Sequence, residues 1–317
     1  MPDWRPTATL ATLRARADLL AAIRSFFAAR EVLEVDTPLL AAAAPSEAQL
    51  ACFPVGTDAG YLVPSPEHAM KRLLAAGSGS IYQLGHVFRA GEVGRWHNPE
   101  FTMLEWYRPG WSMAELIVEV DAFMTHVGGA PALEHTTFAA EFFAHTGLDA
   151  HQATATELAA WADANALAPA QVTTCERHSR AFWLDLIMSV LITPTLGLDA
   201  PLCVEGFPAD DAVLVELSDD EPPIAKRFEI YWRGQELANG AQELTDAGAA
   251  RARMQREQQR RTQAGLPEPA QDGRLQAALQ AGLPACAGVA LGVDRLLALR
   301  LKQSCLAAVL PFAWQRR

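Results

Sequence analysis

Alternation of hydrophobic and polar positions is clearest between Ile81 and Pro109 of the 317-residue chain. The first part of this stretch, 81–89, is rich in β-branched and aromatic residues, and a later part, 101–108, alternates with a period of two. Both patterns are typical of β-strands, so we expect two antiparallel strands joined by a polar loop. The residues that share one face of the second strand are Phe101, Met103, Glu105 and Tyr107.

This face is apolar at one end and acidic at the other. At roughly 6.6 Å for each pair of residues, Phe101 and Glu105 are about 13 Å apart along the strand. Such a spacing suits a ligand with a flat ring at one end and a cation at the other. Residues suited to phosphate groups end the first strand or lie in the loop: Arg89, Arg95, His97 and Asn98.

Apolar residues recur every three or four positions in other stretches, which predicts helices. One helix covers 9–30 with a cap near Thr9 or Thr12, and another covers 66–76 after the N-cap Ser65, with Pro66 at its first position. Further predicted elements are helices over 112–127 and 246–264, strands over 31–40, 213–217 and 228–233, and a strand that turns into a helix over 285–299. The Ala-rich region suggests a helical insertion over about 112–210.

Three carboxylates lie seven residues apart in a second dense stretch, 225–246: Glu229, Glu236 and Glu243. The apolar residues between them indicate a buried sheet rather than an exposed one. Strict alternation places Asn239 and Glu243 on one face and Glu236 on the other. A shared site therefore requires a β-bulge, for which Gly240 is the natural place.

Composition narrows the function classes. The net charge of −11 argues against a broad nucleic-acid footprint, because phosphate neutralisation supplies most nonspecific binding. The five cysteines are far apart, as in a cytoplasmic protein with reduced thiols, and the histidines lack metal-ligand spacing. We expect a cytoplasmic chain with no membrane segment and no signal peptide. The Arg-rich helix over 246–264 is interpreted as a solvated face, with docking of an acidic partner as the alternative.

Four stretches resemble, in order, the motifs of class II aminoacyl-tRNA synthetases, specifically the lysyl branch. EVLEVDTPLL is similar to motif 1, VFRAGEVGRWHNPEFTMLEWY to motif 2 and GVALGVDRLLAL to motif 3, and RGQELANGAQELTD resembles the segment that marks the lysine branch. The resemblance covers nearly the whole chain. It implies an α+β fold, with a six- or seven-stranded antiparallel sheet flanked by helices, in one catalytic domain over 1–317. Motif 1 of that family forms a homodimer interface, so we expect a dimer.

The resemblance also assigns site residues. Those matching the family's ATP contacts are Arg89, Gly91, Glu92, His97, Asn98, Phe101, Glu236, Leu237, Gly292 and Arg295, of which Arg89 and Arg295 are the expected catalytic residues. Phe101 and Arg295 would stack on the adenine, and Glu229 and Glu236 would hold Mg²⁺. Those matching the lysine contacts are Ser65, Pro66, Glu67, Glu105, Tyr107, Asn239, Glu243 and Ala290. Glu67 also has a simpler explanation, since acids are favoured in the first turn of a helix.

Two positions depart from the family pattern. Motif 2 commonly reads Arg-x-Glu, whereas Arg89 is followed by Ala90, Gly91 and Glu92, so Glu92 or main-chain groups would replace the usual glutamate. Ala290 stands where a glycine would lie close to the amino acid. One methyl group is worth about 1 to 3 kcal/mol of discrimination, which would disfavour α-lysine without excluding it.

The chain starts at the helix before motif 1, so we expect no N-terminal OB-type anticodon-binding domain and no tRNA partner. Within the family this is most similar to truncated paralogues that attach (R)-β-lysine to a lysine of translation elongation factor P. The implied activity is ATP-dependent formation of a lysyl or β-lysyl adenylate, followed by transfer to that protein. The alternatives are a minimal tRNA or other amino-acid ligase, and a non-catalytic regulatory module.

Overall fold

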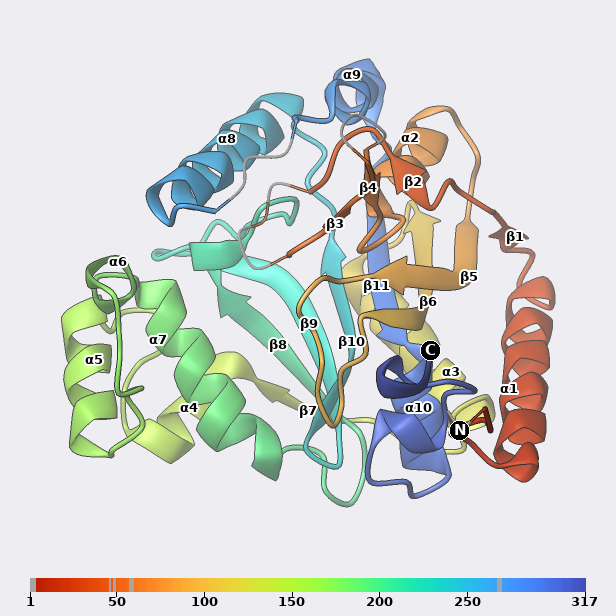
Figure 1. Ribbon diagram of the computed structural model, residues 1–317. Helices are drawn as coiled ribbons and strands as arrows, with labels where there is room; N and C mark the ends of the chain where they lie inside the picture. Colours follow the sequence, from red (N-terminus) through yellow and green to blue (C-terminus); the bar gives the residue numbers. More distant parts are fainter. Residues whose placement is uncertain (1–3, 46, 48–49, 57–59, 267–269) are drawn as a thin grey trace.

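A single large sheet organises the fold (Figure 1). The structure is a computed structural model that describes residues 4–45, 47, 50–56, 60–266 and 270–317. The eight strands run in the order β1-β5-β6-β11-β10-β9-β8-β7. Their bounds are β1 Leu33–Glu34, β5 Ile81–Phe88, β6 Glu100–Pro109, β11 Cys286–Gly292, β10 Gln235–Gln242, β9 Ile224–Trp232, β8 Leu202–Pro208 and β7 Glu134–Thr137.

The expected α+β class is confirmed, but the expected six or seven strands are eight. The inner strands pair antiparallel, whereas the outer strands β1 and β7 pair parallel to β5 and β8. The predicted helical insertion, 112–210, supplies β7 and β8 as well as helices. The strand predicted over 31–40 reduces to β1 and to β2 Leu40–Ala41, which joins β4 Tyr61–Leu62 and β3 Phe53–Pro54 in a small separate sheet. The strand predicted over 213–217 is replaced by isolated bridges at Val215 and Leu217.

Helices surround the sheet in three groups that Figure 1 separates. Their bounds are α1 Leu10–Ala28, α3 Met113–His126 and α10 Val293–Arg300; α4 Phe138–Thr146, α5 Ala155–Ala164, α6 Thr174–Arg177 and α7 Arg180–Ile187; and α2 Glu67–Ala75, α8 Ala247–Gln263 and α9 Gly273–Gly282. The predicted cap at Thr9 is present, and Asp246 caps α8 in the same way, since each side chain accepts a main-chain N–H of the first turn. None of the helices described is both long and apolar enough to cross a membrane.

The largest core cluster lies on one face of the sheet. Trp106, Phe228 and Val289 from three strands pack there with Phe27 of α1 and Phe123 of α3. Residues that alternate with these strand positions point to the opposite face. Glu105, Asn239 and Glu229 of the inner strands lie on that face, opposite the face of Trp106 and Phe228.

A β-bulge changes the alternation of β10, although not at the predicted residue. The β9–β10 register shifts between Glu236 and Ala238, which makes Leu237 the extra residue. The bulge brings Glu236 to the face of Asn239, as the prediction required. Gly240 has another reason to be glycine, because an added Cβ would lie 2.4 Å from Cζ of Phe228.

Candidate active site

A row of directly paired residues crosses the polar face of the sheet. The strand registers place Gln83 opposite Glu105, Glu105 opposite Ala290, Ala290 opposite Asn239, and Asn239 opposite Glu229. Directly paired residues of neighbouring strands point to the same face. The row therefore has a carboxylate on each side of a small central residue, Ala290, and five strands contribute to one site.

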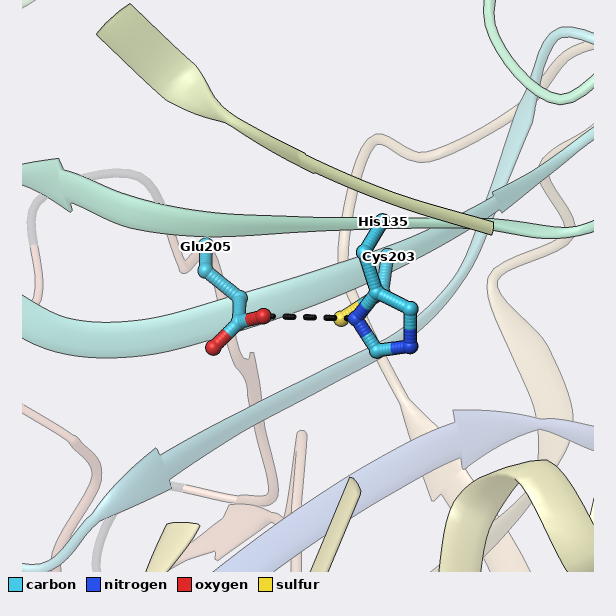
Figure 2. A group of neighbouring side chains, drawn as sticks. All are labelled: His135, Cys203 and Glu205. Carbon is cyan, nitrogen blue, oxygen red and sulfur yellow. Dashed lines mark hydrogen bonds and ion pairs between the residues drawn. The ribbon is translucent and has the colours of Figure 1, made fainter. Parts of the chain in front are cut away.

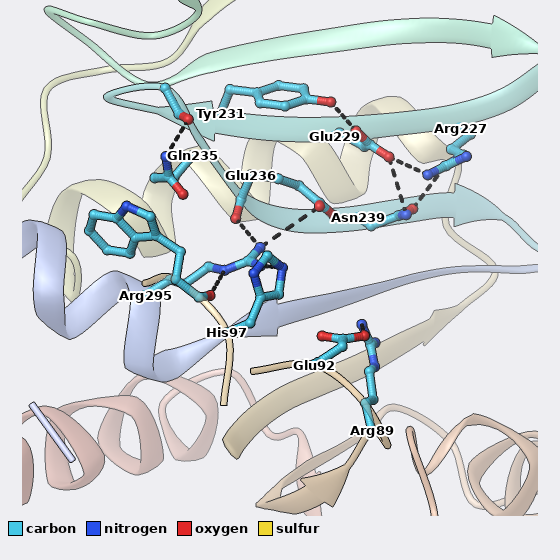
Figure 3. Close-up of polar contacts among 12 residues, drawn as sticks. Arg89, Glu92, His97, Arg227, Glu229, Tyr231, Gln235, Glu236, Asn239 and Arg295 are labelled. Carbon is cyan, nitrogen blue, oxygen red and sulfur yellow. Dashed lines mark hydrogen bonds and ion pairs between the residues drawn. The ribbon is translucent and has the colours of Figure 1, made fainter. Parts of the chain in front are cut away.

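Arg89 and Arg295 stand at the predicted nucleotide end of this face. The Arg89 guanidinium carbon lies 5.2 Å from the centroid of the Phe101 ring. Arg295 donates to two main-chain oxygens, from Nε to Trp96 at 3.2 Å and from Nη1 to Glu236 at 2.8 Å (Figure 3). Both cations are part-exposed, at 27% for Arg89 and 22% for Arg295, so an anionic ligand could reach them.

His97 belongs to this end of the site. Its Nε2 lies 2.9 Å from Nη2 of Arg295, and since arginine only donates, Nε2 accepts the hydrogen bond. Burial and then the Arg295 charge lower the pKa of His97, which favours the neutral ring.

Asn98 does not point toward these residues. Its Nδ2 donates to the Glu100 main-chain oxygen at 2.5 Å, and its Oδ1 accepts the Trp314 N–H at 3.0 Å. This buried amide therefore fixes the loop to the C-terminal segment, and the predicted contact with a nucleotide finds no support in its orientation.

The altered part of motif 2 forms a turn. Gly91 has a φ of 81°, a conformation that glycine adopts without strain. The turn leaves Glu92 with its Oε1 3.7 Å from Nη1 of Arg89. A carboxylate is thus present beside the arginine despite the shift in sequence.

Glu229 and Glu236 are brought to the same face by the bulge. Arg227 and Tyr231 both donate to Glu229, and Nδ2 of Asn239 donates at 3.4 Å (Figure 3). Burial, offset in part by Arg227 and reinforced by Glu236, raises the pKa of Glu229 to about 7. Two oxygen donors on adjacent strands, one of them 41% exposed, fit a magnesium ion that also takes ligands from a phosphate.

The acidic end of the site is built around Glu105. Ser65 Oγ donates to Oε2 of Glu105 at 2.8 Å, and the Tyr107 hydroxyl donates to Oε1 at 2.6 Å. Burial and the nearby charge of Glu67 raise the pKa of Glu105 to about 7. Ser65 also accepts the Glu67 N–H at 3.0 Å, but the predicted N-cap is wrong by one residue, because α2 begins at Glu67 and Pro66 is its N-cap.

A buried lysine joins the remaining acids. Nζ of Lys71 lies 2.6 Å from a carboxylate oxygen of Glu67 and 2.6 Å from one of Glu243. Burial opposes its charge, but Glu243 and Glu67 raise the pKa of Lys71 well above its usual range. The sequence prediction omitted Lys71; the available signal was its position four residues after Glu67 in one helix.

Strand β11 accommodates Tyr107 and Glu243 because it has no side chain at Gly288. A Cβ on Gly288 would lie 2.3 Å from Cε1 of Tyr107 and 2.7 Å from Oε1 of Glu243. Gly292 is the N-cap of α10 and lies against the Arg295 side chain, while the bulge residue Leu237 is buried in the core. Among the predicted site residues, the Asn98 side chain binds main-chain groups and the Leu237 side chain lies in the core, so neither points into this face. The structure adds Lys71, Arg227 and Gln83 to the face.

A separate group of possible metal ligands lies at the far edge of the sheet, where His135, Cys203 and Glu205 have donor atoms within 4.8 Å of one another (Figure 2). His135 Nδ1 is 3.4 Å from Oε1 of Glu205. Burial, and then Glu205, raise the pKa of the Cys203 thiol well above its usual range. A protonated thiol is a poor metal ligand, so this group fits a metal ion less well than the carboxylate pair.

Comparison with known proteins agrees with the family that the motifs indicate. Two similar proteins are called elongation factor P--(R)-beta-lysine ligase, from Proteus mirabilis (strain HI4320) and Yersinia pestis (strain Pestoides F). Each is 43% identical over 321 aligned residues, which cover 98% of this chain and 97% of the relative. The family described as tRNA synthetases class II (D, K and N) matches residues 2–316. The chain therefore belongs to the class II tRNA synthetase family of the D, K and N type.

Proposed function

We propose that this chain is an ATP-dependent ligase that activates (R)-β-lysine, or lysine, and transfers it to the ε-amine of a lysine on elongation factor P. The observation that carries the proposal is the polar row, which has acids for a cationic substrate at one end and cations for a nucleotide at the other. Full-length similarity to proteins named as such ligases supports the acceptor. A chain that modifies a translation factor is expected in the cytoplasm.

ATP would bind with its adenine between Phe101 and Arg295 and with its α-phosphate beside Arg89. The ring-to-cation approach of Arg89 and Phe101, and the fixed position of Arg295, support this arrangement. Glu229 and Glu236 would hold Mg²⁺, which neutralises charge on the phosphates when bound.

The amino acid would occupy the acidic end. Glu105, Glu67 and Glu243 offer carboxylates for two ammonium groups, and Asn239 and Tyr107 border the same space. Ala290 lies directly between Glu105 and Asn239 in the row, so its methyl group would contact the substrate. In this orientation the carboxylate of the substrate amino acid would point toward Arg89.

The substrate carboxylate would attack the α-phosphorus of ATP, and pyrophosphate would leave. Arg89 stabilises the charge that develops at phosphorus, and the strands hold the reacting groups in position, so no protein nucleophile is required. The acceptor ε-amine then attacks the carbonyl of the adenylate, and AMP leaves. A carboxylate of the site or the departing phosphate takes the proton.

We also propose that the chain acts as one catalytic domain and as a homodimer. Exposed leucines occur in the segment that corresponds to motif 1 and on the helix α1 that precedes it: Leu33, Leu39 and Leu40 in the former and Leu10 in the latter. Apolar groups of this kind are typical of an interface between subunits.

The test is intact-mass analysis of elongation factor P after incubation with the chain, ATP and each lysine isomer. We expect the factor to gain the mass of one lysyl group, and the gain to be greater with (R)-β-lysine. A parallel filter assay for charged tRNA examines the minimal synthetase. Labelled tRNA with an unmodified factor would contradict the proposal, and absence of pyrophosphate exchange would favour a non-catalytic module.

A further inference from the structure

The two predicted adenine contacts are connected through the residues next to them in sequence. Thr102 follows Phe101, and Asp294 precedes Arg295. The Thr102 N–H donates to Oδ2 of Asp294 at 2.8 Å. The last residues paired between β6 and β11 at this end are Met103 and Gly292, so this bond ties β6 to the first turn of α10 just beyond that pairing.

Arg16 of helix α1 completes the connection from a distant part of the chain. Its Nη2 donates to Oγ1 of Thr102 at 2.6 Å, and its Nη1 forms an ion pair with Oδ1 of Asp294. The side chains are 12% exposed for Arg16 and 2% for Asp294. One guanidinium thus contacts both β6 and the start of α10.

The arrangement requires the shape of an arginine. Two nitrogens of the planar guanidinium reach two elements at once, which a lysine ammonium does not reproduce in the same geometry. Asp294 lies in the first turn of α10, where the helix dipole already favours an acid. A buried ion pair is in general no more stabilising than apolar residues of similar volume, so stability alone gives little reason for Arg16.

We propose that Arg16 is a positioning residue for the nucleotide: through Thr102 and Asp294 it fixes the spacing between the Phe101 ring and the Arg295 guanidinium. The inference rests on the proposed function, because it takes these two side chains as the adenine contacts. It assigns to α1 a role in the ATP site, although α1 provides no residue to that site.

The first test measures nucleotide binding by calorimetry with a non-hydrolysable ATP analogue, for the wild type and for Arg16→Lys and Arg16→Met. Both variants are expected to bind the analogue about tenfold more weakly, because small displacements of contact groups reduce binding and rate strongly. The KM for lysine at saturating ATP, from pyrophosphate exchange, should remain unchanged. Arg14→Met is the matched control, since Arg14 is exposed on the same helix, and it should behave as the wild type.

A second variant distinguishes a loss of nucleotide positioning from a loss of folding. Arg16→Met combined with Asp294→Asn removes both charges, so that no buried carboxylate is left without its partner. It should melt near the wild-type temperature and still bind the analogue weakly.

The possible outcomes distinguish failure of the positioning role of Arg16 from failure of the proposed function. Analogue affinity of Arg16→Lys and of the double variant equal to that of Arg14→Met would overturn the positioning role. Equal increases in the KM values for ATP and lysine would overturn it as well, because they indicate a general structural effect. If the wild type itself bound no nucleotide, the proposed function would be contradicted instead.

Discussion

At the scale of single residues, the acidic end of the site is characterised by an excess of carboxylates over cations. Glu105 and Glu243 are buried, Glu67 is part-exposed beside them, and the buried Lys71 ammonium contacts Glu67 and Glu243. Buried charges are costly unless they are paired, so the pKa values of Glu105 and Glu243 are raised, whereas at Glu67 partial burial is outweighed by Lys71, which lowers the pKa. A substrate with two ammonium groups would add positive charge beside these acids.

This environment makes lysine binding dependent on pH. Burial and then Glu67 raise the pKa of Glu105 to about 7, so its carboxyl group is about half protonated at neutral pH. An ammonium group binds the ionised form, and that form increases from about a tenth at pH 6 to about nine tenths at pH 8. We expect the affinity for lysine to rise about tenfold over this interval, because binding follows the ionised fraction. Calorimetric titrations across this interval measure it.

The control is Glu105→Gln, which cannot ionise. Its pH dependence should be weaker than that of the wild type, with the remaining slope due to Glu243, whose pKa burial also raises to about 7. An unchanged slope in Glu105→Gln would show that Glu105 does not titrate in this range.

Loss of Lys71 should damage both stability and substrate binding. Lys71→Met leaves Glu67 and Glu243 without the ammonium that each contacts at 2.6 Å. Removing one member of a buried ionic group costs about 3 to 5 kcal/mol of unfolding free energy. Urea denaturation followed by circular dichroism measures this, and pyrophosphate exchange should show a raised KM for lysine.

An exposed pair provides the comparison for Lys71. Lys226 and Glu216 form an ion pair in which both side chains are about 40% exposed, at 42% and 41%. Lys226→Met should therefore cost no more than about 1 kcal/mol. Similar losses in both variants would mean that burial does not set the importance of Lys71.

Sequence alone located most of this site, but not its internal cation. The motifs identified Glu67 and Glu243. Lys71 looks like an ordinary helix residue, because the sequence does not show whether a lysine is exposed or buried. Asn98 illustrates the converse. Its place in the motif suggested a ligand contact, but its amide bonds to Glu100 and Trp314. Tertiary partners decide such roles, and local pattern does not contain them.

At the scale of elements, the hydrophobic pattern predicted β5, β6, β9 and β11, and helical spacing predicted α1, α3 and α8. It did not predict β7 or β8, because both lie in the Ala-rich region that was expected to be helical. The strand predicted over 31–40 does contain β1, but only two of its residues pair with β5. The bulge in β10 was expected at Gly240 but occurs at Leu237. Gly240 is needed instead for the Phe228 ring, a contact between strands that the sequence of one strand does not reveal.

Strand β11 should tolerate no side chain at Gly288. A Cβ there would lie 2.3 Å from the Tyr107 ring and 2.7 Å from Glu243, so both would have to move. Gly288→Ala should cost about 1 to 3 kcal/mol, as overpacking of a dense site does. It should also raise the KM for lysine more than the KM for ATP, because the displaced groups lie at the acidic end. Denaturation and pyrophosphate exchange measure the two effects.

The control for Gly288→Ala is the same substitution at Gly85 in β5. The nearest atom to a Cβ at Gly85 is Nε2 of Gln83 at 3.8 Å, an ordinary contact. Gly85→Ala should be neutral or stabilising by up to about 1 kcal/mol, because alanine has less conformational freedom to lose. If Gly85→Ala matched Gly288→Ala in both measurements, loss of flexibility rather than crowding would explain the effect.

At the scale of the whole molecule, the site joins segments from nearly the full length of the chain. Ser65 and Glu105 meet at the acidic end, while His97 and Arg295 meet at the other. The Arg16 contacts extend this connection to α1, the helix that precedes motif 1. Any interface that fixes α1 would therefore also fix one side of the nucleotide site.

The last prediction concerns that interface. Leu10 on α1 and Leu33 on β1 are exposed by 69% and 56%, and they lie on the helix before motif 1 and in motif 1 itself. We expect a dimer in light scattering coupled to size exclusion, and a monomer for the double variant Leu10→Glu and Leu33→Glu, because buried charges without partners oppose association. Leu198→Glu is the control, since this leucine is 58% exposed elsewhere on the surface, and it should remain dimeric. A dimer that persists in the double variant would place the contact on another surface, and a monomeric wild type would exclude this interface at the concentration used.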